Sequence, residues 1–417
     1  MLANITDYGM NGEGVAKIDN KVFLINNSLI GEQVEIEVVK DFGNYAIGKV
    51  SKIITKSPNR ADLACANCNN CGGCCLQHMQ YEEQLKFKSI LVEKTLKKVS
   101  NISFPVKTCI ASDSQFNYRN KVSFNFSNNQ SGFYKPNSHD IVEISSCNLA
   151  SENINKVYSL FVNYLKTNKL SGVKNLVVRD IDNQILVGVV AKAEIALLSF
   201  FNQLKQNFAN VGLYLIINTR KDSVVLSGKV KHIAGIKNIQ INNFGLTYNV
   251  DLIGFQQINI NIQNKLYNKV LSYINKDDIV INAFSGQGLL SAIIATKAKN
   301  VVGIEIVKNS HLSAEQLKKQ NNITNLTNIC ADFNTEISKH LHKANTIVLD
   351  PAKKGIGKQT ISKINGIKNI IYISCNPIAL AKDLRELSNY EIEEIQPYDM
   401  FPNTNSVETL VKLKLKN

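Results

Sequence analysis

Two side chains near the C-terminal end, Cys375 and Glu408, have the types needed for covalent catalysis on a pyrimidine ring. Carbon 5 of uracil is a poor nucleophile, so its methylation requires a thiolate to add at carbon 6 first, which creates an enolate. The proton on carbon 5 must then leave, and this step needs a nearby base. Taken alone, Cys375 is more often a buried inert thiol and Glu408 more often a surface charge. Neighbouring motifs therefore decide between these interpretations.

The segment before these residues has the pattern of a nucleotide-like cofactor site. An apolar run over 279–281 leads to Gly286-Gln287-Gly288, and glycines between a strand and a helix let the backbone approach a ligand closely. Glu305 ends the next run, where its carboxylate can accept both hydroxyls of a ribose. Asp332 and Asp350 follow the third and fourth runs. One such acid is as often a helix N-cap, but the series favours a cofactor site.

The type of cofactor follows from one missing glycine. A dinucleotide dehydrogenase normally carries Gly-x-Gly-x-x-Gly, whereas Ser291 occupies the third glycine position here. S-adenosylmethionine is therefore favoured over NAD. Because Cys375 follows a later apolar run, its thiol is expected at the same edge as this cofactor.

Five cysteines between residues 65 and 75 predict a metal centre. Cys65, Cys68, Cys71 and Cys75 satisfy the ferredoxin spacing Cys-x2-Cys-x2-Cys-x3-Cys, although the proline expected after the last cysteine is absent. Four thiolates can equally bind a structural zinc, and purely structural free thiols are a third interpretation. Disulfides are not expected in a reducing compartment.

The elements that must position these residues fall into three parts. Residues 1–58 alternate apolar and polar side chains in short runs between turns, which predicts a small β-barrel. Residues 59–250 predict a mixed α+β domain, in which 76–100 has helical spacing and is expected to pack on the catalytic domain. In 251–417, apolar β runs alternate with amphipathic stretches of helix length. We therefore expect an α/β protein with a doubly wound, Rossmann-like C-terminal domain.

The charge of the chain favours a polyanionic partner. Lys and Arg outnumber Asp and Glu by 48 to 34, which gives a formal charge of +14. Part of this excess can come from codon drift toward Lys, Asn and Ile in AT-rich genomes. The N-terminus has no leader pattern and no window approaches 18 uninterrupted apolar residues. We expect a cytoplasmic monomer that binds RNA, with no DNA or membrane partner.

Several motifs, in one order along nearly the whole chain, resemble those of a known family. The family is that of the RNA uracil-5-methyltransferases with an N-terminal TRAM domain, an OB-like barrel, and an iron-sulfur cluster. Independent motifs in the family's order are very unlikely by chance. The matching segments are Gly12–Ala16, Ile30–Val34, Tyr118–Lys121, Gly132–Tyr134, Phe255–Asn259, Ser374–Pro377 and Phe401–Glu408.

The resemblance implies a role for each residue of the site. Cys375 would be the nucleophile and Glu408 the proton acceptor, while the TRAM barrel and the central domain would grip RNA as the target base is flipped out. The cofactor residues that it implies are Gln257, Phe284, Glu305, Asp332 and Asp350, beside Gly286 and Gly288 of the glycine turn. A [4Fe-4S] cluster would be bound by Cys65, Cys71, Cys74 and the distant Cys147, which leaves Cys68 and Cys75 without a role.

The sequence departs from the family pattern at four positions. Asn282 stands where the family usually has an acid, and Leu289 where a polar residue often helps to bind the cofactor. Lys353 replaces an arginine and so loses a planar fork, and Ser406 replaces a histidine. These changes concern the positioning of substrate and cofactor and leave the expected nucleophile, base and cluster ligands intact.

The RNA target is open between two classes. A uridine of 23S ribosomal RNA is favoured, because a TRAM domain with a cluster resembles the ribosomal branch of the family. Methylation of the thymine loop of transfer RNA is the alternative, although the bacterial enzymes of that type lack both features. A catalytically idle RNA-binding assembly factor is a third hypothesis, against which the intact Cys375 and Glu408 argue.

Overall fold

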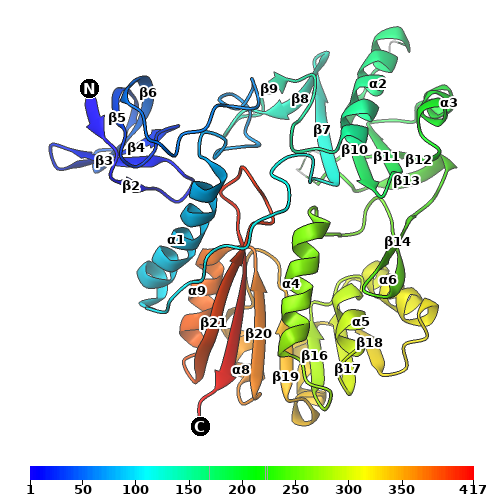
Figure 1. Ribbon diagram of the computed structural model, residues 1–417. Coiled ribbons are helices and arrows are strands. Elements are labelled where there is room, and N and C mark those ends of the chain that lie inside the picture. The colour runs from blue at the N-terminus through cyan, green and yellow to red at the C-terminus, as the bar shows by residue number, and fades with distance from the viewer. Residues whose placement is uncertain (169, 221, 223) are drawn as a thin grey trace.

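In the described part of the chain, three large sheets follow one another in the sequence, with a two-stranded hairpin before the last (Figure 1). The computed structural model describes residues 1–168, 170–220, 222 and 224–417. In Figure 1 the N-terminal sheet lies at the upper left, the second sheet at the upper right and the C-terminal sheet below them. This arrangement confirms the mixed α/β class expected from the sequence.

The N-terminal sheet has six strands in the order β1-β5-β6-β4-β3-β2. Alternate side chains of its strands, such as Phe23, Ile25 and Val34, turn inward and form a small core of their own. This sheet therefore folds around its own apolar residues, and its alternating side chains follow the period-two pattern of the sequence. Its strands are β1 (Leu2–Asn4), β2 (Asp7–Tyr8), β3 (Gly14–Ile18), β4 (Lys21–Asn26), β5 (Gln33–Asp41) and β6 (Tyr45–Thr55).

A buried ion pair fastens the barrel to the segment that follows it. Arg60 donates to both carboxylate oxygens of Glu32, from Nε at 2.6 Å and from Nη2 at 2.7 Å. The amides of Leu29 and Ser57 donate to the same carboxylate at 2.9 and 3.2 Å. The Glu32 side chain is fully buried, so its charge depends on these four bonds.

The second sheet has the order β13-β12-β11-β10-β7-β8-β9, and only β11 and β12 pair in parallel. Helices α2 and α3 cover one face with Phe161 and Phe200, which pack near Phe124 of the sheet. Its elements are β7 (Lys121–Ser127), β8 (Gln130–Tyr134), β9 (Ile141–Glu143), α2 (Glu152–Asn168), β10 (Val173–Ile181), β11 (Gln184–Ala191), α3 (Leu198–Asn207), β12 (Asn210–Ile217) and β13 (Lys229–Gly235).

The C-terminal sheet has the order β18-β17-β16-β19-β20-β22-β21, and its first five strands are parallel. The last two strands run antiparallel to their neighbours. The hairpin β14 (Ile239–Asn243) and β15 (Leu246–Val250) and the helix α4 (Ile260–Tyr273) precede it. Its strands are β16 (Ile279–Ala283), β17 (Asn300–Glu305), β18 (Leu326–Cys330), β19 (Thr346–Leu349), β20 (Asn369–Ser374), β21 (Tyr390–Tyr398) and β22 (Glu408–Leu415).

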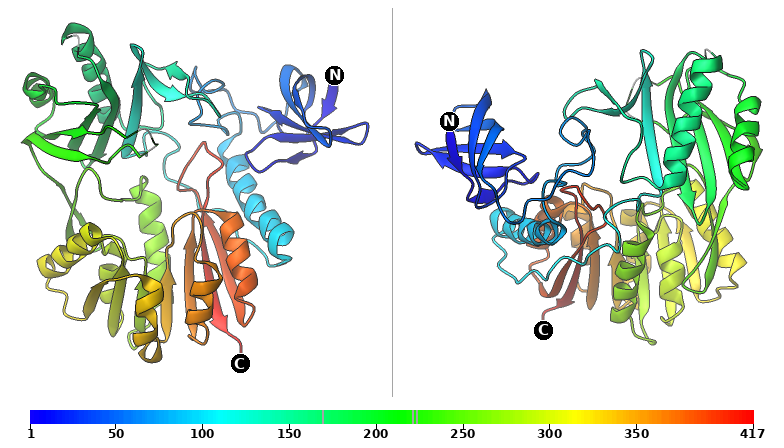
Figure 2. Two further views of the ribbon diagram at one scale, coloured as in Figure 1. Left: turned by 180° about the vertical axis from the view of Figure 1, so that it is seen from behind. Right: turned by 45° about the horizontal axis from the view of Figure 1, so that its top comes forward.

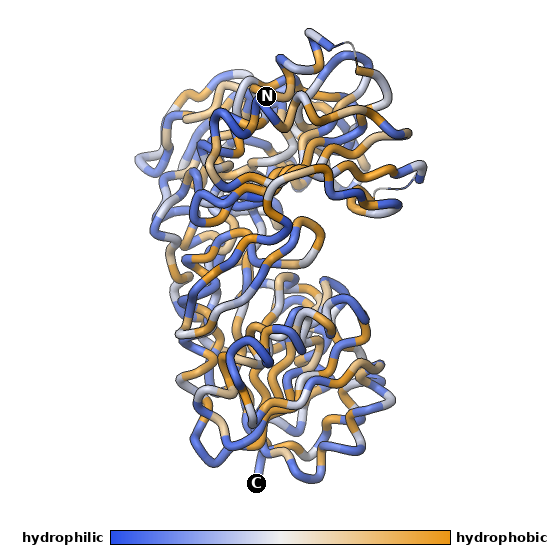
Figure 3. The backbone as a smooth tube through the Cα atoms, turned by 90° about the vertical axis from the view of Figure 1, so that its right-hand side faces the viewer, coloured by the Kyte–Doolittle hydropathy of each residue, from blue (hydrophilic) through white to orange (hydrophobic). Residues whose placement is uncertain are grey.

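Helices cover both faces of this sheet, so its strands are apolar on both sides (Figure 2). In the lower part of Figure 3, the inner segments of the chain are mainly hydrophobic and the outer turns mainly hydrophilic. Side chains of α4, α5 and α6 pack on one face, and those of α1, α8 and α9 pack on the other. The doubly wound architecture predicted from the alternating runs is confirmed. The helices are α1 (Tyr81–Ser100), α5 (Leu289–Ala295), α6 (Lys308–Gln320), α7 (Phe333–Glu336), α8 (Gly357–Ile364) and α9 (Pro377–Glu386), with short 3-10 helices at Ile337–Lys339 and Leu341–Lys343.

Helix α1 belongs to the sequence before the central sheet but packs on the C-terminal one, against α9 and β21. Phe87, Val92 and Leu96 bury its apolar face there. The polar Gln84 and Lys88 are buried on the same helix. None of the helices in the described ranges is both long and apolar enough to cross a membrane.

The Glu32–Arg60 pair predicts a specific loss of stability. Glu32→Gln removes the buried carboxylate and leaves the guanidinium unpaired, so we expect the free energy of unfolding to fall by about 3 kcal/mol. Chemical denaturation followed by circular dichroism measures this change. The exposed pair Lys21–Asp41 supplies the control, because Asp41→Asn should leave the unfolding curve unchanged. Equal effects of the two substitutions would contradict this role of the buried pair.

The pH dependence of the same pair has a defined sign. Burial alone raises the pKa of Glu32, but the bonds from Arg60, Leu29 and Ser57 outweigh it and hold the pKa below its usual value of 4.5. Its stabilisation is therefore complete above pH 4.5 and is lost as the pH falls through the lower pKa of the folded state.

Candidate active site

The candidate site lies at the place where the strand order of the C-terminal sheet reverses. Strand β16 is central, with β17 on one side and β19 on the other, so the connections leave it in opposite directions. Ligands of doubly wound sheets bind beyond the carboxyl ends of the strands at such a point. The turns after β16, β19 and β20 meet there around one cavity of about 960 Å³.

The turn after β16 brings backbone close to this cavity. Phe284, Gly286 and Gly288 all have positive φ angles, of 58°, 55° and 81°. A Cβ atom on Gly288 would lie 2.6 Å from the Cβ of Ala314 in α6, so this position requires glycine. Phe284 and Gly286 line the cavity, whereas Gly288 caps the N-terminus of α5 behind it.

Two acids predicted to bind the cofactor, Glu305 at the end of β17 and Asp332 after β18, have different surroundings. Glu305 accepts from the Gly286 amide at 2.9 Å and from the Val307 amide at 2.7 Å, so its carboxylate is fixed beside the glycine turn. Asp332 accepts from the Thr335 amide at 3.3 Å as the N-cap of α7. Neither acid is among the residues that line the cavity.

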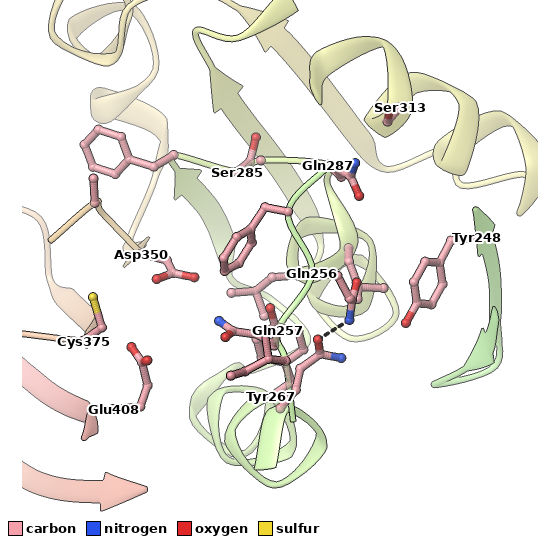
Figure 4. Close-up of a pocket in the computed structure, with 18 of the residues that line it drawn as sticks. Tyr248, Gln256, Gln257, Tyr267, Ser285, Gln287, Ser313, Asp350, Cys375 and Glu408 are labelled. Atoms are coloured by element: carbon pink, nitrogen blue, oxygen red, sulfur yellow. Dashed lines mark hydrogen bonds between the residues drawn. The ribbon is translucent and has the colours of Figure 1, made fainter. Parts of the chain in front are cut away.

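Cys375, Glu408 and Asp350 come together at the other end of the cavity (Figure 4). Asp350 follows β19 and Cys375 follows β20. Strand β22 runs antiparallel to β20 with Thr409 opposite Ser374, so Glu408 reaches the same edge as Cys375. The reversal of one strand thus places a carboxyl group beside a thiol that follows a parallel strand.

Burial shifts the ionisation of all three groups toward their neutral forms. Burial raises the pKa of Asp350 to about 7. Burial and the charge of Asp350 raise the pKa of Glu408 well above its usual value. The pKa of the Cys375 thiol rises to about 11, because of burial first and then the charge of Glu408, while Lys353 acts in the opposite direction.

The central domain and its linker complete the cavity. Gln257, predicted as a cofactor residue, lines it, and its carbonyl accepts from Asn120 Nδ2 at 2.9 Å. Arg179 of β10 is fully buried and donates to the Gly254 carbonyl at 2.6 Å, which fixes the start of this segment. The loop that carries Gln257 is therefore held by the second sheet.

Sequence reasoning assigned no role to several other residues of the cavity. Arg119 lines it, and its Nε has no hydrogen-bond partner among the described residues. Phe255 also lines it and is largely exposed. Both residues lie in segments that match the family motifs, and this match is the signal in the sequence that could have identified them as part of the site. The four positions that depart from the family pattern, Asn282, Leu289, Lys353 and Ser406, all line this cavity too.

A second cavity, of about 350 Å³, is lined by cysteines from two segments. Cys65, Cys71 and Cys74 come from the segment before α1, and Cys147 comes from the segment after β9. Cys68 also lines this cavity, whereas Cys75 does not. All nine cysteines are free thiols in the structure. Within the described ranges, no three His, Cys, Asp or Glu side chains stand together closely enough to hold one metal ion.

Two family profiles match the chain. The profile described as tRNA (Uracil-5-)-methyltransferase matches residues 80–416, and the TRAM domain profile matches residues 1–51. The chain belongs to the tRNA (uracil-5-)-methyltransferase family. The resemblance based on the sequence motifs is thereby confirmed, and this family member is an RNA methyltransferase with an N-terminal TRAM domain.

Relatives of this family member match it over nearly their whole length. Uncharacterized RNA methyltransferases of Clostridium tetani and Clostridium acetobutylicum are 32% and 31% identical to it, over 98% of this chain and 94% and 96% of those proteins. The crystal structure of Pyrococcus abyssi tRNA (uracil-54, C5)-methyltransferase in complex with S-adenosyl-L-homocysteine has a TM-score of 0.84 at 24% identity. The structural match covers 99% of this chain and 99% of that chain, so the two proteins share one fold over their whole length.

The raised pKa of Cys375 predicts slow alkylation. At neutral pH, iodoacetamide should modify Cys375 more slowly than the exposed Cys330, and its rate should increase with pH toward about 11. Peptide mass spectrometry at successive times measures both rates in one sample. Lys353→Met should slow the reaction of Cys375 further and leave Cys330 unchanged. Equal rates at neutral pH for the two thiols of the folded protein would contradict the prediction.

Proposed function

We propose that this chain transfers a methyl group from S-adenosylmethionine to carbon 5 of a uridine in RNA, with Cys375 as nucleophile and Glu408 as proton acceptor. One observation carries this proposal: a thiol and a buried carboxyl group share one cavity at the switch point of the sheet. Methylation at carbon 5 needs a nucleophilic thiol and a proton acceptor that both reach the same uracil ring.

The residues at the switch point fit the methyl donor. Glu305 is held beside the glycine turn, where a ribose can be bound, and Gly286 leaves open space for a ligand, since a Cβ there would meet nothing within 4 Å. Phe284 and Gln257 line the same cavity. When bound, S-adenosylmethionine supplies an electrophilic methyl group and a positively charged sulfonium. We therefore propose Gln257, Phe284, Gly286, Gly288, Glu305 and Asp350 as its site, with Asp332 at the periphery.

Cys375 and Glu408 act one after the other. Cys375 gives its proton to water and its sulfur bonds to carbon 6, so the ring electrons move to carbon 5. Carbon 5 takes the methyl group as the bond from that methyl to the sulfonium breaks, which leaves S-adenosylhomocysteine. The carboxylate of Glu408 then removes the proton of carbon 5, and the bond between sulfur and carbon 6 breaks to release the product. The Lys353 charge favours the thiolate at the first step. Glu408 must be ionised at the second, and its raised pKa makes it a stronger base once ionised.

Two RNA targets are candidates. We propose a uridine of 23S ribosomal RNA, because the N-terminal TRAM domain and the cysteine segment, residues 65–76, resemble the ribosomal branch of the family. The full-length likeness to a tRNA (uracil-54, C5)-methyltransferase supports the thymine loop of transfer RNA as the second candidate, since a chain with the same overall fold acts on tRNA. A cytoplasmic location and a monomeric state stay predictions.

The cysteine cavity supports a [4Fe-4S] cluster bound by Cys65, Cys71, Cys74 and Cys147. The thiolates of such a cluster bind four different irons, so they must surround a cavity rather than meet at one point. The four side chains line one cavity from two segments. Methyl transfer from a sulfonium needs no electron, so we propose that the cluster joins these segments during folding or RNA positioning.

The chemistry predicts a trapped adduct. RNA substituted with 5-fluorouridine should form a covalent complex with the protein, because fluorine on carbon 5 cannot leave as a proton. Denaturing electrophoresis with labelled 23S fragments and tRNA transcripts measures the complex and identifies the target. Cys375→Ala should form none, whereas Cys330→Ala should behave like the wild type. A complex that persists in Cys375→Ala would overturn the assigned nucleophile.

The cluster proposal predicts a metal content. Protein purified without oxygen should contain about four iron atoms and as many sulfides per chain. Cys74→Ser and Cys147→Ser should each lose most of this iron, while Cys330→Ser should keep it. Elemental analysis together with visible absorbance measures both. One zinc per chain, or iron content unchanged in both ligand variants, would contradict the proposal.

A further inference from the structure

The loop that carries the proposed base has no regular structure of its own. It runs over 399–407, between β21 and β22, and ends at Glu408. Thr404, Asn405 and Ser406 line the cavity beside Glu408 and Cys375. The position of the carboxyl group therefore depends on what this loop contacts outside the sheet.

Gln84 of helix α1 makes a two-point contact with the loop. Its Oε1 accepts from the Asn403 amide at 2.9 Å, and its Nε2 donates to Asn403 Oδ1 at 3.2 Å. Asn403 is buried and has a φ of 67°, a left-handed conformation that needs support. Its side chain also donates to the Gln115 carbonyl at 2.8 Å.

The cysteine segment contacts the same residue. The amides of Cys75 and Leu76 both donate to the Asn403 carbonyl at 3.1 Å. Every polar group of Asn403 is therefore bound by residues far away in the sequence. This single position joins α1, the cysteine segment and the loop of Glu408.

Lys88, one turn further along α1, holds the start of the loop. It pairs with Asp399 and donates to the Phe401 carbonyl at 3.0 Å. Both charged side chains are fully buried. A buried ion pair costs desolvation, so the two charges depend on each other and on the Phe401 carbonyl for compensation. Gln84 and Lys88 together contact loop residues 399, 401 and 403.

We infer that helix α1 is a positioning element for the proton-removal step, with Gln84 and Lys88 fixing Glu408 through loop 399–407. The inference rests on the proposed function. Neither residue lines the cavity, so both act through the loop and not on the substrate. Cys375 lies on a different connection, after β20, so its own backbone position is set by another part of the sheet.

The inference predicts which step slows. In Gln84→Met, which has a similar volume but no amide, turnover should fall by on the order of 10²-fold, as expected for a base displaced by about 1 Å. The KM for S-adenosylmethionine should stay within about twofold of the wild-type value. Because the methylated adduct forms but cannot lose its proton, covalent RNA–protein complex should accumulate on ordinary uridine RNA.

The experiment compares this variant with a matched one. Thr95→Val removes a buried hydrogen bond from the same helix, to the Leu91 carbonyl at 2.6 Å, and Thr95 makes no hydrogen bond to the loop within the described residues. Four proteins are assayed: wild type, Gln84→Met, Thr95→Val and Glu408→Gln. The readouts are complex on ordinary RNA, complex on 5-fluorouridine RNA, and the isotope effect with deuterium on carbon 5. Asn403→Gly, which tolerates the positive φ, serves as the second variant if Gln84→Met does not fold.

Each outcome has one meaning. The inference is supported if Gln84→Met or Asn403→Gly accumulates complex on ordinary RNA as Glu408→Gln does, with a larger isotope effect than wild type, while Thr95→Val does not. It is overturned if the loop variants turn over like Thr95→Val, or if they lose the 5-fluorouridine complex together with turnover. If wild type forms no 5-fluorouridine complex, the proposed function itself fails, which is a distinct result.

Discussion

Three acidic groups share one poorly solvated cavity, and the site depends on the energetic cost of charging them there. Burial raises the pKa of Asp350, Glu408 and Cys375, and each charge hinders the next. Burial in this cavity therefore opposes the accumulation of negative charge. Lys353 is the positive group that opposes this at Cys375. A cationic donor would favour the ionised forms, so the reactive state is expected to appear only when the cavity is filled.

The architecture brings these groups together from different connections of the sheet. Parallel strands β19 and β20 deliver Asp350 and Cys375 at their carboxyl ends, and the antiparallel β22 delivers Glu408 at its beginning. A parallel strand in that position would have carried its first residue to the opposite edge. The irregular loop before β22 joins it to its antiparallel neighbour β21. It needs external support, which α1 and the cysteine segment supply.

Much of this arrangement could be predicted from the sequence, because periodicity and strand-end residues are local patterns. The apolar runs predicted the doubly wound sheet, and Gly286, Asp350, Cys375 and Glu408 were predicted for one edge, where the structure places them. Asp332 shows the limit, since an acid after a strand is also the pattern of a helix N-cap. Contacts across long separations, such as Gln84 with Asn403, leave no periodic pattern and could not be predicted.

The most direct test of the central claim is nucleotide-resolved mapping of 5-methyluridine in ribosomal and transfer RNA from cells with and without this gene. The account predicts that one methylated uridine position or a small set of positions, in 23S RNA, loses the mark and regains it with the wild-type gene but not with the Cys375→Ala form. Loss only in transfer RNA would keep the chemistry and overturn the target. An unchanged map in both RNA classes would contradict the account.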